Sequence, residues 1–295
     1  MASTTAQDPR NAGPKPPFPQ QPISHPGSVR QMDPPADHGE TSYQGTDKLK
    51  ERVAIVTGGD SGIGRAVAIA FAKEGAKVLI SFLPEERADA DDTVSAIEAA
   101  GGTVVQVPGD LREQKTIEAL VSTAIERFGH LDIVVNNAGY QMSHEEIEEL
   151  SPEELEHTFR VNVFATFLLS QAALSKMQPG GVILNTTSIQ AYDPSPQLVA
   201  YAATKAAILS MTKSISSIAM KRGVRVNAVA PGPVWTPLIP STMPAEKAKN
   251  FGGNTEFGRP AQPVELAKIF VFLASDDASY VTGEVYGATG GQSPY

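Results

Sequence analysis

The stretch Val53-Ala-Ile-Val-Thr-Gly-Gly-Asp-Ser-Gly-Ile-Gly64 decides the fold that this sequence predicts. Its first four residues are apolar and typical of a short buried strand. The helix predicted over residues 62–75 carries Ile63, Val67 and Phe71 on one stripe. A glycine turn between a strand and a helix lets a pyrophosphate approach the backbone, and the helix N-terminus favours its charge. The spacing departs from Gly-x-Gly-x-x-Gly, so a purely structural glycine turn is the alternative.

Strands and helices alternate along the chain after this stretch. Further strands are predicted at 78–80, 104–107, 133–135, 181–188, 224–229 and 284–286, and helices at 88–100, 113–128, 152–177, 200–220 and 263–275. The helix at 152–177 is expected to begin at the N-cap Ser151, with Glu154 completing a capping box. The strands are apolar throughout, as in a parallel sheet that is covered on both faces. We therefore predict an α/β fold: a Rossmann-type doubly wound parallel sheet in three layers, a single catalytic domain over residues 49–295.

Residues 1–48 differ in composition from the rest of the chain. Prolines recur through this segment and aliphatic residues are scarce. Such a segment buries too little apolar surface to fold alone and favours extended structure. We interpret it as a Pro-rich N-terminal arm. A disordered tail is the alternative, but the isolated apolar residues Phe18, Ile23 and Tyr43, separated by stiffening prolines, favour docking on the protein's own surface and on a neighbouring subunit.

Composition excludes several classes of function. The 295-residue chain has a formal net charge of −9 and no cysteine. The acidic balance disfavours a nucleic-acid partner, and the lack of cysteine excludes disulfides and thiolate metal sites. The histidines at 130, 144 and 157 lack metal-ligand spacing, so no metal is expected. No apolar run approaches the ~18 residues of a membrane span, and the N-terminus lacks a signal-peptide core, so we expect a cytoplasmic protein.

Three side chains form a candidate proton-transfer site. Tyr201 and Lys205 are four residues apart on one face of a predicted helix, and Ser188 ends the apolar run before it. An ammonium beside a phenol favours the phenolate and lowers its pKa from about 10. A hydroxyl at a strand's carboxyl end can bind an oxygen that the phenol also reaches, which suits proton transfer to an alcohol or carbonyl. A lone Tyr-x-x-x-Lys arises often by chance, so the glycine-rich stretch upstream carries much of the argument.

The order of motifs resembles the short-chain dehydrogenase/reductase family over roughly residues 48–290. The motifs are Thr57 to Gly64, Asp110-Leu111, Asn136-Asn137-Ala138-Gly139, Asn162, Ser188, Tyr201 with Lys205, and Pro231-Gly232 with Thr236. The arm and Leu83-Pro84-Glu85-Glu86 are similar to a subgroup that includes general stress oxidoreductases and plant glucose/ribitol dehydrogenases.

The resemblance implies a role for each matched residue. Tyr201 would exchange the proton, Ser188 would bind the substrate oxygen, and Lys205 would lower the Tyr201 pKa and hold the nicotinamide ribose. Asn162 would hold a relay water, and residues 235–258 would form a substrate lid. The implied cofactor contacts are Gly58, Asp60, Ser61, Gly62, Ile63, Gly64, Phe82, Asp110, Leu111, Asn136, Ala138, Gly139, Tyr201, Lys205, Pro231, Gly232, Val234 and Thr236.

The activity that the resemblance implies is hydride transfer between a nicotinamide cofactor and a small alcohol, aldehyde, ketone or sugar. We expect NAD over NADP, because Ser61, Phe82 and Leu83 stand where NADP-binding members often carry a cation for the 2′-phosphate. Arg65 and Arg87 remain alternative cations. The family also implies a homotetramer through the long helices.

Two other functions remain open. A dinucleotide-binding sensor or scaffold without turnover is the main alternative, although it would not need the Asn/Ser/Tyr/Lys set. An epimerase or dehydratase is a third possibility, but such enzymes usually carry a longer C-terminal substrate region.

Overall fold

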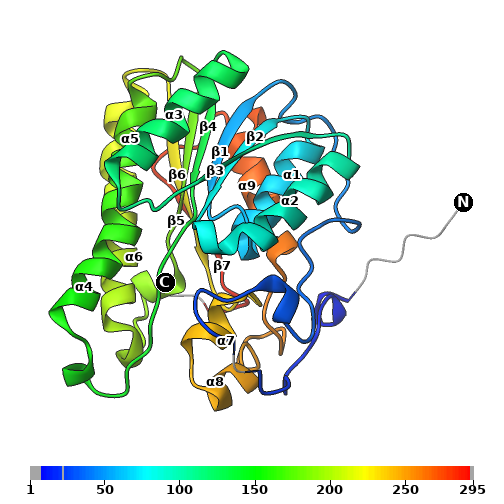
Figure 1. Cartoon of the computed structure of the whole chain (residues 1–295), viewed down its shortest axis with the longest axis vertical. Helices are drawn as coiled ribbons and strands as arrows, with labels where there is room; N and C mark the ends of the chain where they lie inside the picture. The colour runs from blue at the N-terminus through cyan, green and yellow to red at the C-terminus, as the bar shows by residue number, and fades with distance from the viewer. Residues whose placement is uncertain (1–7, 22, 293–295) are drawn as a thin grey trace, which may run out of the picture.

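The computed structural model describes residues 8–21 and 23–292 (Figure 1). Its strands are β1 (Val53–Thr57), β2 (Lys77–Phe82), β3 (Thr103–Pro108), β4 (Ile133–Asn136), β5 (Val182–Thr186), β6 (Arg225–Pro231) and β7 (Val285–Ala288). Its helices are α1 (Gly62–Lys73), α2 (Arg87–Ala99), α3 (Gln114–Phe128), α4 (Pro152–Phe159), α5 (Ala165–Leu174), α6 (Val199–Met220), α7 (Leu238–Thr242), α8 (Ala245–Lys249) and α9 (Pro263–Ala274). Each predicted strand and helix is present in the predicted order.

All seven strands form one parallel sheet with the order β3-β2-β1-β4-β5-β6-β7. The predicted doubly wound parallel sheet is therefore confirmed. The chain adds β2 and β3 on one side of β1, and β4 to β7 on the other. In sheets of this kind, ligands bind beyond the carboxyl ends of the strands, where the order reverses. The crevice that this fold predicts lies between the ends of β1 and β4.

Helices cover both faces of the sheet, which gives three layers (Figure 1). Successive side chains of a strand point to opposite faces. In β1, Ala54 and Val56 therefore join the core beneath α1, α2 and α9, while Val53 and Ile55 join the core beneath α3, α5 and α6. All four are fully buried, which explains why the strand is a continuous apolar run.

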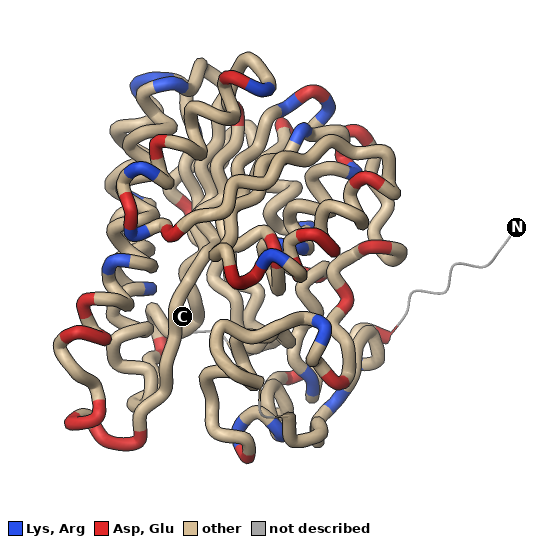
Figure 2. Tube along the Cα trace, in the orientation of Figure 1, with Lys and Arg blue, Asp and Glu red and all other residues tan. Residues whose placement is uncertain are grey.

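The helix predicted over residues 152–177 is interrupted. A π-helical segment at Arg160–Phe164 separates α4 from α5, and α5 already ends at Leu174. The backbone N–H of Glu154 donates to Ser151 Oγ at 3.1 Å, as expected for the N-cap. The predicted capping box is wrong, because the Glu154 carboxylate lies 2.7 Å from His144 Nε2 instead. Figure 2 shows the acidic tip that precedes α4, whose side chains at 145–149 are all exposed.

The described part of the arm lies across the surface of the catalytic domain. Phe18, Ile23 and Tyr43 are all buried, as expected for docking anchors. Phe18 and Ile23 pack with Trp235 and Ile239 in a small core of their own.

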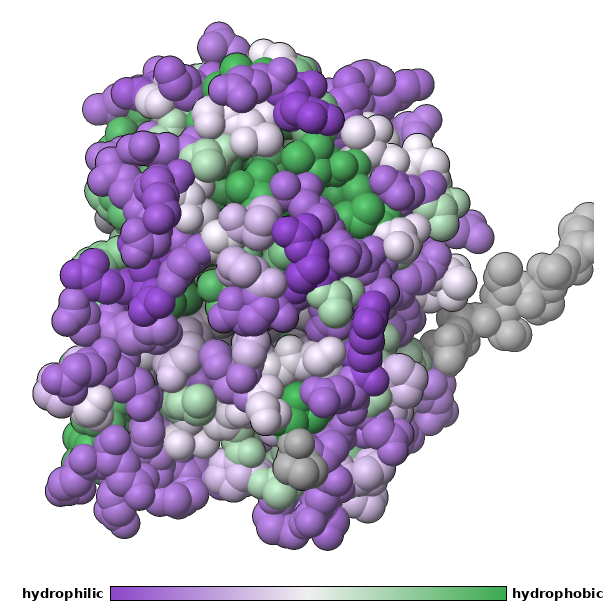
Figure 3. All heavy atoms as spheres, viewed as in Figure 1, coloured by the Kyte–Doolittle hydropathy of each residue, from purple (hydrophilic) through white to green (hydrophobic). Residues whose placement is uncertain are grey.

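Apolar side chains also gather over the edge strand β3 (Figure 3). Among the residues that the structure describes, no helix is both long enough and apolar enough to cross a membrane.

Candidate active site

A cavity of about 1240 Å³ opens at the carboxyl ends of the strands. The glycine-rich turn after β1 forms its floor, and the segments after β4, β5 and β6 line it from one side. Ile239, Met243 and Phe251, from the segment that was predicted to form a lid, add an apolar wall. The cavity therefore lies where the reversal of strand order predicts a ligand site.

The glycine-rich turn has a shape that side chains would destroy. Gly58 and Gly62 have φ values of +61° and +50°, a region that favours glycine. A Cβ on Gly64 would lie 1.9 Å from the carbonyl oxygen of Gly58. The Asn137 amide donates to the carbonyl oxygen of Thr57 at 3.1 Å and ties the turn to the end of β4. This backbone cradle, which leads into the N-terminus of α1, fits a pyrophosphate.

Polar groups near the carboxyl ends of β1 and β2 suit the ribose next to the cradle. Ser81 is fully buried and lines the cavity, and its Oγ has no hydrogen-bond partner among the described residues. Asp60 and Glu86 line the same region. Burial raises the pKa of Asp60, and burial together with the charge of Asp60 raises the pKa of Glu86. An unpartnered hydroxyl and two carboxyl groups match the hydroxyls of a ribose, so these residues fit a nicotinamide dinucleotide.

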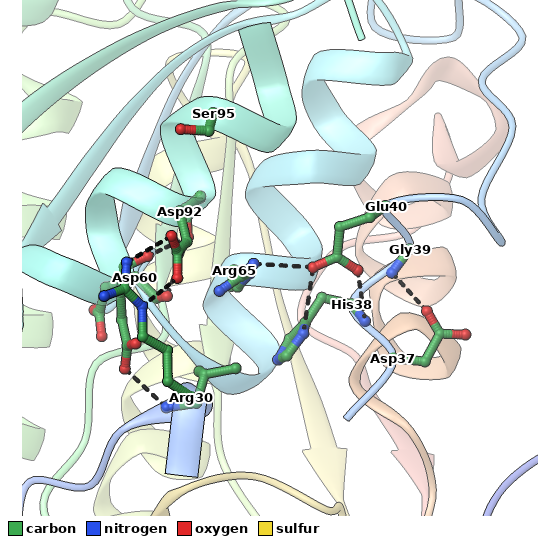
Figure 4. Close-up of polar contacts among 12 residues, drawn as sticks. Arg30, Asp37, His38, Gly39, Glu40, Asp60, Arg65, Asp92 and Ser95 are labelled. Carbon is green, nitrogen blue, oxygen red and sulfur yellow. Dashed lines mark hydrogen bonds and ion pairs between the residues drawn. The ribbon is translucent and has the colours of Figure 1, made fainter. Parts of the chain in front are cut away.

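The cations at this end of the cleft are engaged by protein groups. Arg65 is buried, and its Nη2 lies 3.1 Å from Glu40 Oε1 of the arm (Figure 4). The Arg87 guanidinium lies over the Phe82 ring, 5.2 Å from its centroid. Arg112 forms an ion pair with Asp110 at 2.5 Å. Both alternative cations, Arg65 and Arg87, therefore have a partner within the protein, but Nε and Nη1 of Arg65 are buried without a hydrogen-bond partner among the described residues.

Ser188, Tyr201 and Lys205 come together at the cleft. Ser188 follows β5, and the other two lie in the first turns of α6. Lys205 Nζ is 5.3 Å from the Tyr201 ring centroid and donates to the carbonyl oxygen of Thr186 at 2.8 Å. Thr187 Oγ1 donates to the carbonyl oxygen of Lys205 at 2.7 Å, which fixes α6 against the end of β5.

The electrostatics of this group differ from the sequence prediction. Burial raises the pKa of Tyr201 to about 12, although a hydrogen bond with Ser188 lowers it in part. Burial also lowers the pKa of Lys205 to about 8. The structure therefore does not show the predicted lowering of the Tyr201 pKa by Lys205, which stays a prediction. Desolvation disfavours both the phenolate and the ammonium.

Asn162 lies behind the cleft. It is fully buried in the π-helical segment, and its Oδ1 accepts from the backbone N–H of Tyr140 at 2.7 Å. Its Nδ2 donates to the carbonyl oxygen of Tyr140 at 2.9 Å and to Thr204 Oγ1 at 3.0 Å. The side chain thus ties the segment after β4 to α6. A relay water bound by Asn162 stays a prediction.

Most of the predicted site residues line the cavity. They are Gly58, Asp60, Ser61, Gly62, Ile63, Phe82, Asp110, Leu111, Ala138, Gly139, Ser188, Tyr201, Lys205, Pro231, Gly232, Val234 and Thr236. Gly64, Asn136 and Asn162 are not among the lining residues. Asn136 is buried within the sheet, where its Nδ2 donates to Asn185 Oδ1 at 2.8 Å.

Sequence reasoning missed several lining residues. Ser81 and Glu86 lie near the end of β2, where the sequence predicted a cofactor contact only at Phe82. His25 and Pro26 of the arm also line the cavity, and nothing in their Pro-rich surroundings indicates this. Contacts between segments so distant in sequence become visible only in the folded chain.

Comparisons with known proteins agree with this geometry. A family model described as enoyl-(acyl carrier protein) reductase matches residues 58–293. General stress protein 39 of Bacillus subtilis (strain 168) is 45% identical over 90% of this chain and 93% of its own. Glucose and ribitol dehydrogenase of Daucus carota is 42% identical over 92% of this chain and 96% of its own.

A solved structure shows the same fold with a cofactor. It is a short chain dehydrogenase from Burkholderia cenocepacia J2315 in complex with NADP, with a TM-score of 0.78 and 29% identity over 83% of this chain and 98% of that one. The predicted resemblance, including the subgroup with an arm, is confirmed. The protein is an NAD(P)-dependent oxidoreductase, and the chain belongs to the short-chain dehydrogenase/reductase family.

Proposed function

We propose that Tyr201 exchanges the proton with the substrate oxygen while Ser188 binds that oxygen. The convergence of Ser188, Tyr201 and Lys205 on one cleft, with Lys205 Nζ 5.3 Å from the Tyr201 ring centroid, is the observation that carries this proposal. When bound, the nicotinamide supplies or accepts the hydride. A Tyr201 pKa of about 12 keeps the phenol protonated at neutral pH, so it is ready to donate its proton to a carbonyl oxygen. The phenolate left behind faces the Ser188 hydroxyl and the nearby Lys205 ammonium, and both stabilise negative charge.

The substrate is proposed to be a small alcohol, aldehyde, ketone or sugar. The lid places apolar Ile239 and Met243 beside polar Gln141 and Gln190 around the cleft. This mixed lining suits a molecule that combines carbon surface with hydroxyl or carbonyl groups. The name of the carrot relative supports sugars and polyols as the first class to screen.

NAD remains the proposed cofactor, with NADP as the alternative. A 2′-phosphate requires an available cation, whereas Asp60 and Glu86 place carboxyl groups at this end of the cleft. Arg65 Nη2 pairs with Glu40 and Arg87 lies over Phe82, whereas Nε and Nη1 of Arg65 have no hydrogen-bond partner among the described residues. The solved relative that binds NADP shows that the family also accommodates the phosphate, so kcat/KM must be compared for both cofactors.

Assembly, location and domain division stay predictions. A homotetramer through α4, α5 and α6 is supported by exposed apolar side chains, such as Phe164, Phe167, Ile218 and Met220. Ile208, also on α6, is buried within its own subunit. A cytoplasmic location and the boundary between arm and catalytic domain at residue 48 are likewise proposals.

The test of the proposed function is Tyr201→Phe, which keeps the ring and removes the proton. Wild type and variant are screened with sugars, polyols, aldehydes and ketones, using both nicotinamides and the absorbance of the reduced cofactor. We expect turnover to fall by at least ~10²-fold. Fluorescence titration should still detect binding of the reduced dinucleotide, and an unchanged far-UV circular dichroism spectrum should show that the fold is intact. Near-wild-type turnover in the variant would exclude Tyr201 as the acid.

A further inference from the structure

The arm crosses the mouth of the cleft between two anchors. On the lid side, the Phe18 ring stacks on Trp235 with centroids 4.1 Å apart, and its backbone N–H donates to the carbonyl oxygen of Lys249 at 2.8 Å. On the other side, the backbone N–H of Val29 donates to Asp89 Oδ2 of α2 at 2.8 Å. Figure 1 shows the arm, in dark blue, running between α7 and α2. Residues 24–28 therefore lie between the lid and α2.

The segment between the anchors is seated against the lid. Gly27 has a φ of +91°, and a Cβ on it would lie 2.9 Å from the carbonyl oxygen of Pro237. Pro26 and His25 line the cavity directly. Because the backbone is packed on the lid, these two residues are held at the cleft.

His25 lines the cleft beside segments that follow β2 and β4. Its ring lies 5.2 Å from that of Tyr140, which follows β4, in an edge-on arrangement. Burial and the charge of His157 lower the pKa of His25, and Glu85, which follows β2, is close enough for its charge to oppose this shift in part. β2 and β4 flank β1 in the sheet, and the glycine-rich turn follows β1. An imidazole between Glu85 and Tyr140 therefore lies above the region of that turn.

We propose that the arm is the outer wall of the dinucleotide site and that His25 contacts the adenosine diphosphate half of the bound cofactor. Imidazole offers a ring face for adenine and a hydrogen-bond donor for ribose or phosphate oxygens. The ring of His25 meets Tyr140, which in turn packs edge-on against His157 with centroids 4.4 Å apart, so an aromatic surface borders the site. Residue 25 lies outside residues 58–293, which the family model matches, so this contact is a property of the arm.

A second consequence concerns cofactor release. A dinucleotide under the strap of residues 24–28 leaves only after that segment moves or after the ligand slides past it. The strap adds contacts to the bound dinucleotide. When contacts of this kind change the affinity, most of the change appears in the dissociation rate. His25 should therefore slow release more than it changes association.

The contact is tested by chemical protection, independently of catalysis. The chain has no cysteine, so His25→Cys in the full chain introduces a single thiol. Gln31→Cys is the matched control, because Gln31 is exposed on the same arm but does not line the cavity. The rate of alkylation by iodoacetamide is measured alone, with AMP, with nicotinamide mononucleotide and with the reduced dinucleotide, whose binding is verified by fluorescence.

At a dinucleotide concentration of about 100 Kd, the thiol at position 25 should react at least ~10-fold more slowly, and the thiol at position 31 at an unchanged rate. AMP should also protect position 25. An unchanged rate at position 25 in the saturated protein overturns the proposal. Protection by nicotinamide mononucleotide but not by AMP overturns the placement on the adenosine half.

His25→Ala tests the effect on release. Stopped-flow fluorescence should show the reduced dinucleotide leaving about 10-fold faster than from wild type, which corresponds to ~1.4 kcal/mol. Gln31→Ala should leave the release rate unchanged, and both variants should keep the wild-type melting temperature. A His25→Ala variant that melts earlier but releases cofactor at the wild-type rate would show a purely structural arm and overturn the proposal.

Discussion

The sheet and the arm are held to the molecule by different forces. The four apolar residues of β1 are fully buried between helices, so apolar burial supplies most of the stability there. The arm has few apolar anchors and docks mainly through polar groups. Lys73 Nζ donates to the carbonyl oxygens of Gly39, Glu40 and Tyr43 at 2.7–3.0 Å.

Glu74 provides a second polar anchor for the arm. It accepts from Tyr43 Oη at 2.5 Å, from the backbone N–H of Thr46 at 2.7 Å and from that of Lys48 at 3.0 Å. These bonds depend on the C-terminal end of α1 being in place. The arm therefore docks on polar groups that only the folded domain presents.

Replacing a phenylalanine by alanine in the core, at Phe71, and in the arm, at Phe18, gives the sharpest contrast between the two regions. Phe71 is fully buried in the core beneath α1 and α9, and Phe71→Ala should cost about 4 kcal/mol of unfolding free energy. Because the core unfolds as a unit, circular dichroism and cofactor binding should be lost together in urea. Separate transitions for the two signals would contradict a single cooperative core.

Gly64→Ala disrupts the glycine-rich turn between β1 and α1. The new Cβ would meet the Gly58 carbonyl oxygen at 1.9 Å and the Asn137 amide nitrogen at 2.5 Å, so the turn must open. We expect a loss of about 3 kcal/mol in stability and failure to bind the reduced dinucleotide by fluorescence titration. Gly287→Ala is the control, since its nearest contact would be an ordinary 3.7 Å. Wild-type affinity in Gly64→Ala would show that the turn does not hold the cofactor.

Phe18→Ala probes the arm with an internal reporter. Trp235 is the single tryptophan of the chain, and it is fully buried beneath Phe18. Because the arm can detach without unfolding the sheet, we expect a smaller loss of about 2 kcal/mol. Tryptophan emission should shift to the red as water reaches the indole, while far-UV circular dichroism stays unchanged. An unshifted emission would contradict docking of the arm on the lid.

Glu40→Gln probes the polar part of arm docking and depends on pH. Burial alone would raise the Glu40 pKa, but His38 and Arg65 outweigh it and lower it to about 2 (Figure 4). Because folding lowers the Glu40 pKa, the ionised Glu40 carboxylate stabilises the folded protein at pH values above its ordinary pKa of 4.5. This stabilisation is lost as the pH falls toward 2.

After allowance for solvent screening, Glu40→Gln should therefore cost about 1 kcal/mol at pH 7. The difference in melting temperature from wild type should shrink by pH 3. A difference that stays constant from pH 7 to pH 3 would show that the carboxylate charge plays no part in docking.

The sequence by itself determined the order of strands and helices, the glycine-rich turn and the spacing of Tyr201 and Lys205. These features follow from local rules: apolar periodicity, the steric freedom of glycine and the pitch of one helix. The covered parallel sheet then followed, because each strand is apolar on both faces. Most of the candidate site could be predicted for the same reason, since it lies at strand ends.

Only the tertiary structure decided the rest. The pKa of Tyr201 depends on how completely the fold removes water from it, which the spacing to Lys205 does not reveal. The π-helical break at Asn162 accompanies three hydrogen bonds to groups on other segments. Arg65 faces Glu40, and His25 lines the cleft, because the arm packs onto a surface that exists only after the sheet has formed. Contacts between such distant segments are set by packing in space, and no local pattern of residues encodes them.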